Sequence, residues 1–115
     1  MFLQKVTSKY KIVSGRLPKL SDVDHLLHYG DFDIPYTAGY IMGSRAKGTH
    51  TENSDIDITL VVPSNWNPPD GLAALNDDLL NVIGDMDGFR HTWDIQVWHE
   101  HDPRLKDYSK IPMKH

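Results

Sequence analysis

Two aspartates open the best-defined strand of the sequence, and this arrangement constrains the fold more than any other feature. Asp55 and Asp57 begin an apolar run that ends at Val62. Because successive side chains of a strand point to opposite faces, the two aspartates share one face while Ile56 and Ile58 share the other. The sequence therefore predicts a core strand that carries two carboxylates at its start.

Two carboxylates on one strand face favour a bound metal ion. Without a cation between them they repel each other, and one is pushed toward protonation. Carboxylate oxygens suit a hard cation such as Mg²⁺, which keeps several of its waters. Asp-x-Asp also occurs in ordinary turns, where the side chains bond to nearby backbone. The pair alone therefore does not define a function.

A Gly-Ser turn precedes the aspartates and suits an anion. Gly43 lets the backbone approach a ligand closely, and Ser44 is expected to cap a short helix through Ala46 and Lys47. Backbone N–H groups at a helix start are a ready anion site. Arg45 and Lys47 add positive charge, which either serves the same anion or points into solvent. A phosphate site ahead of metal-binding carboxylates predicts metal-assisted transfer from a nucleoside triphosphate.

The stretch that joins these features resembles the signature of the DNA polymerase β-like nucleotidyltransferase superfamily, especially its minimal nucleotidyltransferase branch. That signature runs Gly-Ser-x-Ala-x-Gly, five variable residues, and Ser-Asp-x-Asp. Its fixed positions are filled here by Gly43, Ser44, Ala46, Gly48, Ser54, Asp55 and Asp57. The resemblance implies an α/β fold, a small polymerase β-like palm with a mixed sheet of three or more strands flanked by helices.

The resemblance also implies a third carboxylate on a neighbouring strand. Residues 89–98 read as a strand rich in β-branched and aromatic residues, with Asp94 and Trp98 on one face. By resemblance, Asp94 ligates the catalytic metal and helps to deprotonate the attacking hydroxyl. The structural alternative is an edge-strand aspartate that faces water, in which case Asp87 and Asp102 are the next candidates.

The mechanism follows from the resemblance. In such enzymes a nucleoside triphosphate, most simply ATP, binds with its β and γ phosphates on the Gly-Ser turn, and two Mg²⁺ ions lie between the phosphates and three aspartates. A hydroxyl of the acceptor attacks the α-phosphorus and pyrophosphate leaves. The implied nucleotide-binding residues are Gly43, Ser44, Arg45, Lys47 and Ser54, and the implied catalytic and metal-binding residues are Asp55, Asp57 and Asp94.

The acceptor is less well defined by the sequence. The resemblance points to an enzyme that adds AMP to a hydroxyl of a HEPN-type protein partner and so acts as an antitoxin. Two alternatives stay open: transfer to a small hydroxyl compound such as an aminoglycoside, and a non-catalytic module that binds a nucleotide or a partner. A homo-oligomer is compatible with each of these hypotheses.

Length and composition predict one small domain. The 115 residues allow a single core without a separate substrate domain. We expect a basic N-terminal arm over residues 1–20, followed by one nucleotidyltransferase domain over residues 21–115. The net charge of −4 disfavours a surface that coats nucleic acid in general. The chain has neither a signal-peptide pattern nor an apolar run of membrane length, so we expect a cytoplasmic protein that binds no membrane.

Further elements follow from turn residues and periodicity. We expect a helix that Ser21 caps and Gly30 ends, a strand over residues 36–42, and a short helix beyond Pro103. A longer helix follows Pro68-Pro69 and ends at Gly84. Its sheet-facing residues are expected to be Leu72, Leu75, Leu79, Val82 and Ile83.

The histidines and tryptophans suggest rival sites. His91, His99 and His101 have ligand-like chemistry and could bind zinc, although we favour surface histidines. Trp93 and Trp98 are expected to cover the sheet rather than to stack on a base.

Overall fold

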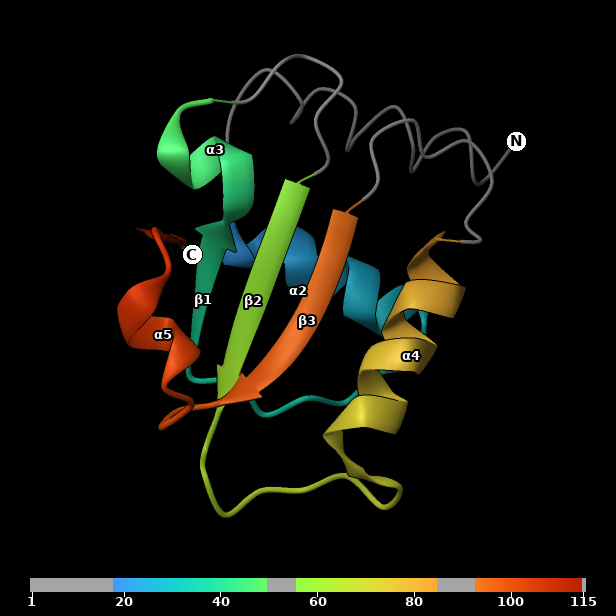
Figure 1. Ribbon diagram of the computed structural model, residues 1–115. Helices are drawn as coiled ribbons and strands as arrows, with labels where there is room; N and C mark the ends of the chain where they lie inside the picture. Colours follow the sequence, from blue (N-terminus) through green and yellow to red (C-terminus); the bar gives the residue numbers. More distant parts are fainter. Residues whose placement is uncertain (1–17, 50–55, 85–92, 115) are drawn as a thin grey trace, which may run out of the picture.

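The computed structural model describes residues 18–49, 56–84 and 93–114 of the chain (Figure 1). Within these ranges, the strands form one sheet in the order β3-β2-β1-β4. The strands are β1 (Ala38–Met42), β2 (Ile56–Val62), β3 (Trp93–His99) and β4 (Ile111–Pro112). β2 pairs in parallel with β3, whereas β1 pairs antiparallel with both β2 and β4. The predicted mixed sheet is therefore confirmed.

Two of the described helices cover one face of this sheet. The helices are α2 (Leu20–Tyr29), α3 (Gly43–Lys47), α4 (Gly71–Gly84) and α5 (Arg104–Asp107). In Figure 1, α2 lies behind the sheet and α4 lies beside β3, whereas α3 continues from the end of β1 and α5 lies near the C-terminus. The predicted α/β class with flanking helices is confirmed.

The core forms between these two helices and every second residue of the strands. On β2 the buried side chains of this face are Ile56, Ile58, Leu60 and Val62, and on α2 they are Leu20, Val23, Leu26 and Leu27. α4 adds the fully buried Leu79, and β3 adds Ile95 and Val97. The period of two predicted for β2 is confirmed, because Asp57 and Thr59 point to the opposite face and line a pocket there.

The N-terminus of α2 differs from the prediction. The N-cap is Lys19 rather than Ser21, and the Asp22 carboxylate accepts a hydrogen bond of 2.9 Å from the Lys19 backbone N–H. The earlier start has a packing reason, because Leu20 is buried in the core and its N–H donates to the Lys114 carbonyl at 2.7 Å. Tertiary contacts therefore override the better capping residue.

The sheet-facing set predicted for α4 is correct only in part. Leu72, Leu75 and Leu79 pack against the core, but Val82 is 39% exposed. Val82 was therefore wrongly placed on the buried face. The side chain of Ile83 lies outside the described residues.

The C-terminal strand β4 was not predicted. Its two residues pair with Tyr40 and Ile41 of β1, and the Met113 N–H donates to the Gly39 carbonyl at 2.9 Å. Two residues, one of them proline, are too short to show a period of two. This pairing returns the C-terminal segment to the sheet.

Most of the predicted basic arm, residues 1–17, lies outside the described residues. In the part of the chain that is described, no helix combines the length and the apolar character that crossing a membrane requires.

Candidate active site

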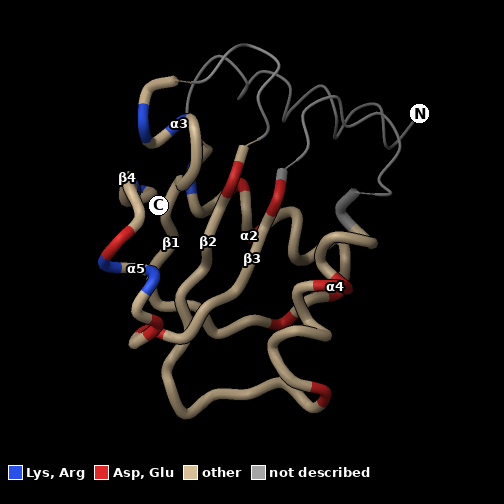
Figure 2. Tube along the Cα trace, viewed as in Figure 1, with Lys and Arg blue, Asp and Glu red and all other residues tan. Residues whose placement is uncertain are grey.

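The centre of the candidate site is a row of residues across three strands. Asp57 of β2 is in register with Asp94 of β3 on one side and with Met42 of β1 on the other. Neighbouring strands lie about 4.8 Å apart, so the two carboxylates start from adjacent positions on the same face. Figure 2 shows these acidic positions side by side at the starts of β2 and β3, with basic positions on α3. The parallel pairing thus brings together two acids that are far apart in the sequence.

Gly43 packs directly against this row. It begins α3 with a φ of +66°, a conformation that favours glycine. A Cβ built on Gly43 would overlap the Asp57 Oδ2 and lie 3.2 Å from the Asp57 Cγ. The backbone of the Gly-Ser turn therefore already contacts the carboxylate, and a larger residue would have to displace it.

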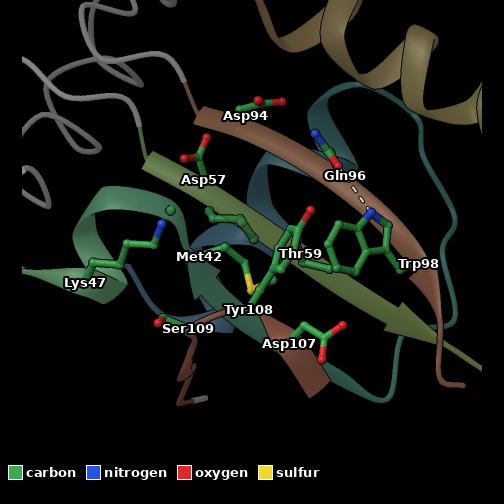
Figure 3. Close-up of a pocket in the computed structure, with 12 residues that line it drawn as sticks. Met42, Lys47, Asp57, Thr59, Asp94, Gln96, Trp98, Asp107, Tyr108 and Ser109 are labelled. Carbon is green, nitrogen blue, oxygen red and sulfur yellow. Dashed lines mark hydrogen bonds between the residues drawn. The ribbon is translucent and has the colours of Figure 1, made fainter. Parts of the chain in front are cut away.

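The rest of α3 is a single turn that carries two basic residues. Met42, not Ser44, occupies the N-cap position, and no side chain caps this helix, so the predicted capping role of Ser44 is wrong. Gly48 ends the helix in the left-handed conformation. Lys47 extends toward the pocket described below (Figure 3). Ser44 and Arg45 belong to α3 but are not among the lining residues of that pocket.

Two predicted site residues, Ser54 and Asp55, lie outside the described residues. The structure therefore describes two of the three predicted catalytic aspartates, Asp57 and Asp94. Among the described residues, no group of three or more His, Asp or Glu side chains forms a metal cluster.

We call Asp57 and Asp94 the acid row, and the face of the sheet on which they lie, opposite the core, the open face. A pocket of about 560 Å³ lies on the open face, between the acid row and the segment that follows α5. This volume is within the range of small-molecule sites. In Figure 3 the two aspartates lie at one end, and the side chains of Asp107 and Tyr108 lie at the other. The lining residues are Met42, Gly43, Lys47, Asp57, Ile58, Thr59, Asp94, Gln96, Trp98, Asp107, Tyr108 and Ser109.

A second row of polar residues, which was not predicted from the sequence, forms the middle of the pocket. Thr59 and Gln96 are in register with each other, two residues beyond the acid pair on the same strand face. The Gln96 Oε1 accepts a hydrogen bond of 3.2 Å from the Trp98 Nε1–H. The signal was available, because a polar residue stands at i+2 from each aspartate inside two otherwise apolar strands.

An aromatic pair closes the far end of the pocket. Trp98 is buried, as expected for a residue that covers the sheet, and the Arg104 guanidinium lies 3.9 Å from its ring centroid. The Tyr108 ring meets Trp98 at 70° with centroids 5.8 Å apart, and Tyr108 is 52% exposed. Tyr108 was not predicted as a site residue. Nothing in its local sequence shows that β4 returns this segment to the sheet.

Arg104 is held by the neighbouring Asp102. The Arg104 Nη2 lies 2.8 Å from the Asp102 Oδ2, and the Arg104 Nε donates to Asp102 Oδ1 at 3.1 Å. Hydrogen bonding from Arg104 lowers the pKa of Asp102. Asp102, an alternative candidate for the third acid, thus has a structural partner and lies outside the lining of the pocket.

The rival zinc site is not assembled in the described part of the chain. The His99 Nε2 lies 2.9 Å from the Trp66 carbonyl oxygen, and His101 lies 3.6 Å from the Glu100 carboxylate. His91 lies outside the described residues. His99 and His101 therefore have separate partners, and no cluster of three metal-binding side chains forms among the described residues.

Comparison with known proteins identifies the family. A family model of the nucleotidyltransferase domain matches residues 36–112, which is more than half of the chain. The chain therefore belongs to the nucleotidyltransferase domain family. The match begins just before β1 and ends in β4, so it contains the acid pair, Gly43 and the whole described sheet.

One solved structure is similar over part of its length. It is the crystal structure of a candidate nucleotidyltransferase from Sulfolobus solfataricus, with 25% sequence identity and a TM-score of 0.42. The similarity covers 68% of this chain and 62% of that chain, so this chain spans less than two thirds of the other protein. A search of the curated proteins gave no match.

Proposed function

We propose that the protein transfers a nucleotide, most simply AMP from ATP, to a hydroxyl group of a protein partner. One observation carries the proposal: Asp57 and Asp94 are register partners and line one pocket with Gly43 and Lys47, in a chain of the nucleotidyltransferase domain family. Carboxylates beside a cationic side chain in a pocket of this size suit a triphosphate that is accompanied by a divalent metal.

The donor set fits a hard cation. Asp57 and Asp94 offer carboxylate oxygens from adjacent strands, and like charges at this separation favour a cation between them. Asp55 is the proposed third ligand, and two Mg²⁺ ions are the proposed metals. Bound to these residues, the metal would neutralise phosphate charge and activate the attacking hydroxyl.

The remaining roles belong to the protein and the substrates. The Lys47 ammonium is proposed to contact phosphate oxygens, and Ser44, Arg45 and Ser54 complete the proposed nucleotide-binding set. The acceptor oxygen forms a bond to the α-phosphorus, the bond from that phosphorus to the β-bridging oxygen breaks, and pyrophosphate leaves. The hydroxyl proton passes to the Asp94 carboxylate or to solvent. This role requires that Asp94 be ionised at the start of the reaction.

The open face of the sheet supports a macromolecular acceptor. α2 and the buried Leu79 of α4 pack in the core on the opposite face, and no described residue of either helix lines the pocket. Transfer rather than hydrolysis needs water to be excluded from the reacting phosphate, and a partner docked over this face would exclude it. We therefore propose a HEPN-type partner that gains AMP on a tyrosine or another hydroxyl, with the present protein as its antitoxin.

Labelled ATP tests the proposal. The protein is incubated with Mg²⁺, labelled ATP and a lysate of its native host, and mass spectrometry identifies the molecule that gains a nucleotide. Asp94→Asn and the exposed surface variant Asp78→Asn serve as the inactive variant and its matched control. Transfer to a small molecule with no partner present would replace the antitoxin hypothesis with the aminoglycoside-type alternative. No transfer to any molecule, with nucleotide binding intact, would favour a non-catalytic binding module.

A further inference from the structure

The pocket has two chemically different ends. The acid row, Gly43 and Lys47 form one end, and Trp98 and Tyr108 lie at the other. Asp94 and Trp98 are four residues apart on one strand face, so the ends are about 13 Å apart along β3. Thr59 and Gln96 lie between them. This separation leaves room for more than phosphates and metal.

The far end has the chemistry of a nucleoside site. Trp98 is 6% exposed and has Arg104 over its ring, so it forms the floor of this end. Tyr108 meets Trp98 at 70° rather than stacking on it, and half of its surface is exposed. An aromatic side chain with open ring surface in a pocket is a platform on which any base can stack. Thr59 in the middle of the pocket and Ser109 next to Tyr108 add hydroxyl groups to the lining.

We infer that the end of the pocket formed by Thr59, Tyr108 and Ser109 binds the nucleoside part of the substrate, with the base against the Tyr108 ring. The inference rests on the proposed function, which places the phosphates near Lys47 and the acid row. The parts of a nucleotide then match the lining in order along the pocket: the phosphates lie by the charged groups, the ribose by the hydroxyl groups, and the base by the aromatic ring.

A nucleoside fits this end better than the acceptor does. A macromolecular acceptor approaches from solvent over the open face and reaches the acid row directly. The far end is instead bounded by Trp98 on one side and by the segment after α5 on another, and the pocket as a whole has the volume of a small-molecule site. The segment that supplies Tyr108 and Ser109 is held in place by the pairing of β4 with β1.

ATP and inorganic tripolyphosphate, both with Mg²⁺, distinguish the two ends of the pocket, because tripolyphosphate carries the phosphates of ATP without its nucleoside. Isothermal titration compares the native protein with Tyr108→Ala, Tyr108→Phe and Leu80→Ala. Leu80 is an apolar side chain of α4 that is as exposed as Tyr108, at 53% against 52%. We expect Tyr108→Ala to weaken ATP binding about fivefold or more and to leave tripolyphosphate binding unchanged. Tyr108→Phe keeps the ring and should bind ATP like the native protein, as should Leu80→Ala.

Three other outcomes would contradict either the inference or the proposed function. ATP affinity that is unchanged in Tyr108→Ala would assign this end to the acceptor and overturn the inference, while the proposed function would stand. An equal loss for ATP and tripolyphosphate would show that Tyr108 acts on the phosphate end or on the fold, and the inference would fail as well. If the native protein binds neither ligand with Mg²⁺, the proposed function itself fails. Melting temperatures of all variants check that they are folded.

Discussion

The helix-covered face and the open face of the sheet are built from alternate residues of the same strands. On β2, Leu60 packs beneath the helices, whereas its neighbour Thr59 lines the pocket. The covered face is mainly apolar, but the open face has acids, then a hydroxyl and an amide, then an aromatic ring. A single strand thus contributes to the core with one face and to the candidate site with the other, because its side chains alternate. Substitutions on the covered face should unfold the protein, and those on the open face should change binding or transfer.

The largest expected effect is on transfer. Asp57→Asn and Asp94→Asn keep the volume of the side chain but remove a metal-binding charge, so the initial rate of transfer should fall about a hundredfold or more. The melting temperature should change little, because both residues lie on the open face. Asp78→Asn, an exposed change on α4, is the control. A normal rate in Asp94→Asn would mean that another carboxylate, with Asp87 the next candidate, is the third acid.

The next effect is on stability and tests the comparison within one strand. Leu60→Ala removes a fully buried side chain and should lower the free energy of unfolding by about 2–5 kcal/mol. Thr59→Val, one position earlier, exchanges a hydroxyl for a methyl on the open face and should cost about 1 kcal/mol or less. Urea unfolding measures both variants. Equal losses would break the distinction between the two faces.

Gly43 and Gly48, at the two ends of α3, test whether the Gly-Ser turn needs glycine for its contact with Asp57. Gly43 and Gly48 both have positive φ, +66° and +76°, but a Cβ on Gly48 would have no neighbour within 4 Å among the residues that the structure describes. Gly48→Ala should therefore cost only the backbone strain, about 1–2 kcal/mol. Gly43→Ala should cost at least about 1 kcal/mol more, because its Cβ meets the Asp57 carboxylate.

Measurements of metal binding distinguish the effect of the contact between residue 43 and Asp57 from the effect of backbone strain, which both glycine variants share. Gly43→Ala should weaken the binding of Mg²⁺ and ATP, measured by titration, whereas Gly48→Ala should leave this binding close to that of the native protein. Equal stability and equal binding in the two variants would show that the contact between Gly43 and Asp57 has no consequence.

The smallest expected effect concerns the ion pair between Arg104, which lies over the Trp98 ring, and Asp102. Hydrogen bonding from Arg104 lowers the pKa of Asp102 below its ordinary value. The stabilisation from this pair is therefore present above the pKa of the unfolded chain and is lost as the pH falls through the lower pKa of the folded protein. In Arg104→Ala the pKa of Asp102, followed by NMR titration, should rise toward its ordinary value, and the acid-dependent part of the stability should shrink. An unchanged pKa would show that Arg104 is not its cause.

The sequence by itself determined the class of the fold and the strand face on which Asp57 lies. Alternation placed Asp57 on the face opposite Ile56 and Ile58, because a strand has a period of two. The resemblance carried by Gly43 and the aspartates pointed to the family that matches residues 36–112. Local spacing was sufficient for these features, because each depends on residues that are close together in the chain.

Only the tertiary structure decided which distant residues meet. The spacing within β3 gives the face of Asp94, but its pairing with Asp57 rather than Thr59 depends on the register of two strands that α4 separates. Tyr108 reaches the pocket because two residues of β4 pair with β1, a segment too short to have a pattern of its own. Strand register and the path of a short segment are set by packing over the whole domain. Residues that are neighbours in the sequence therefore cannot define them.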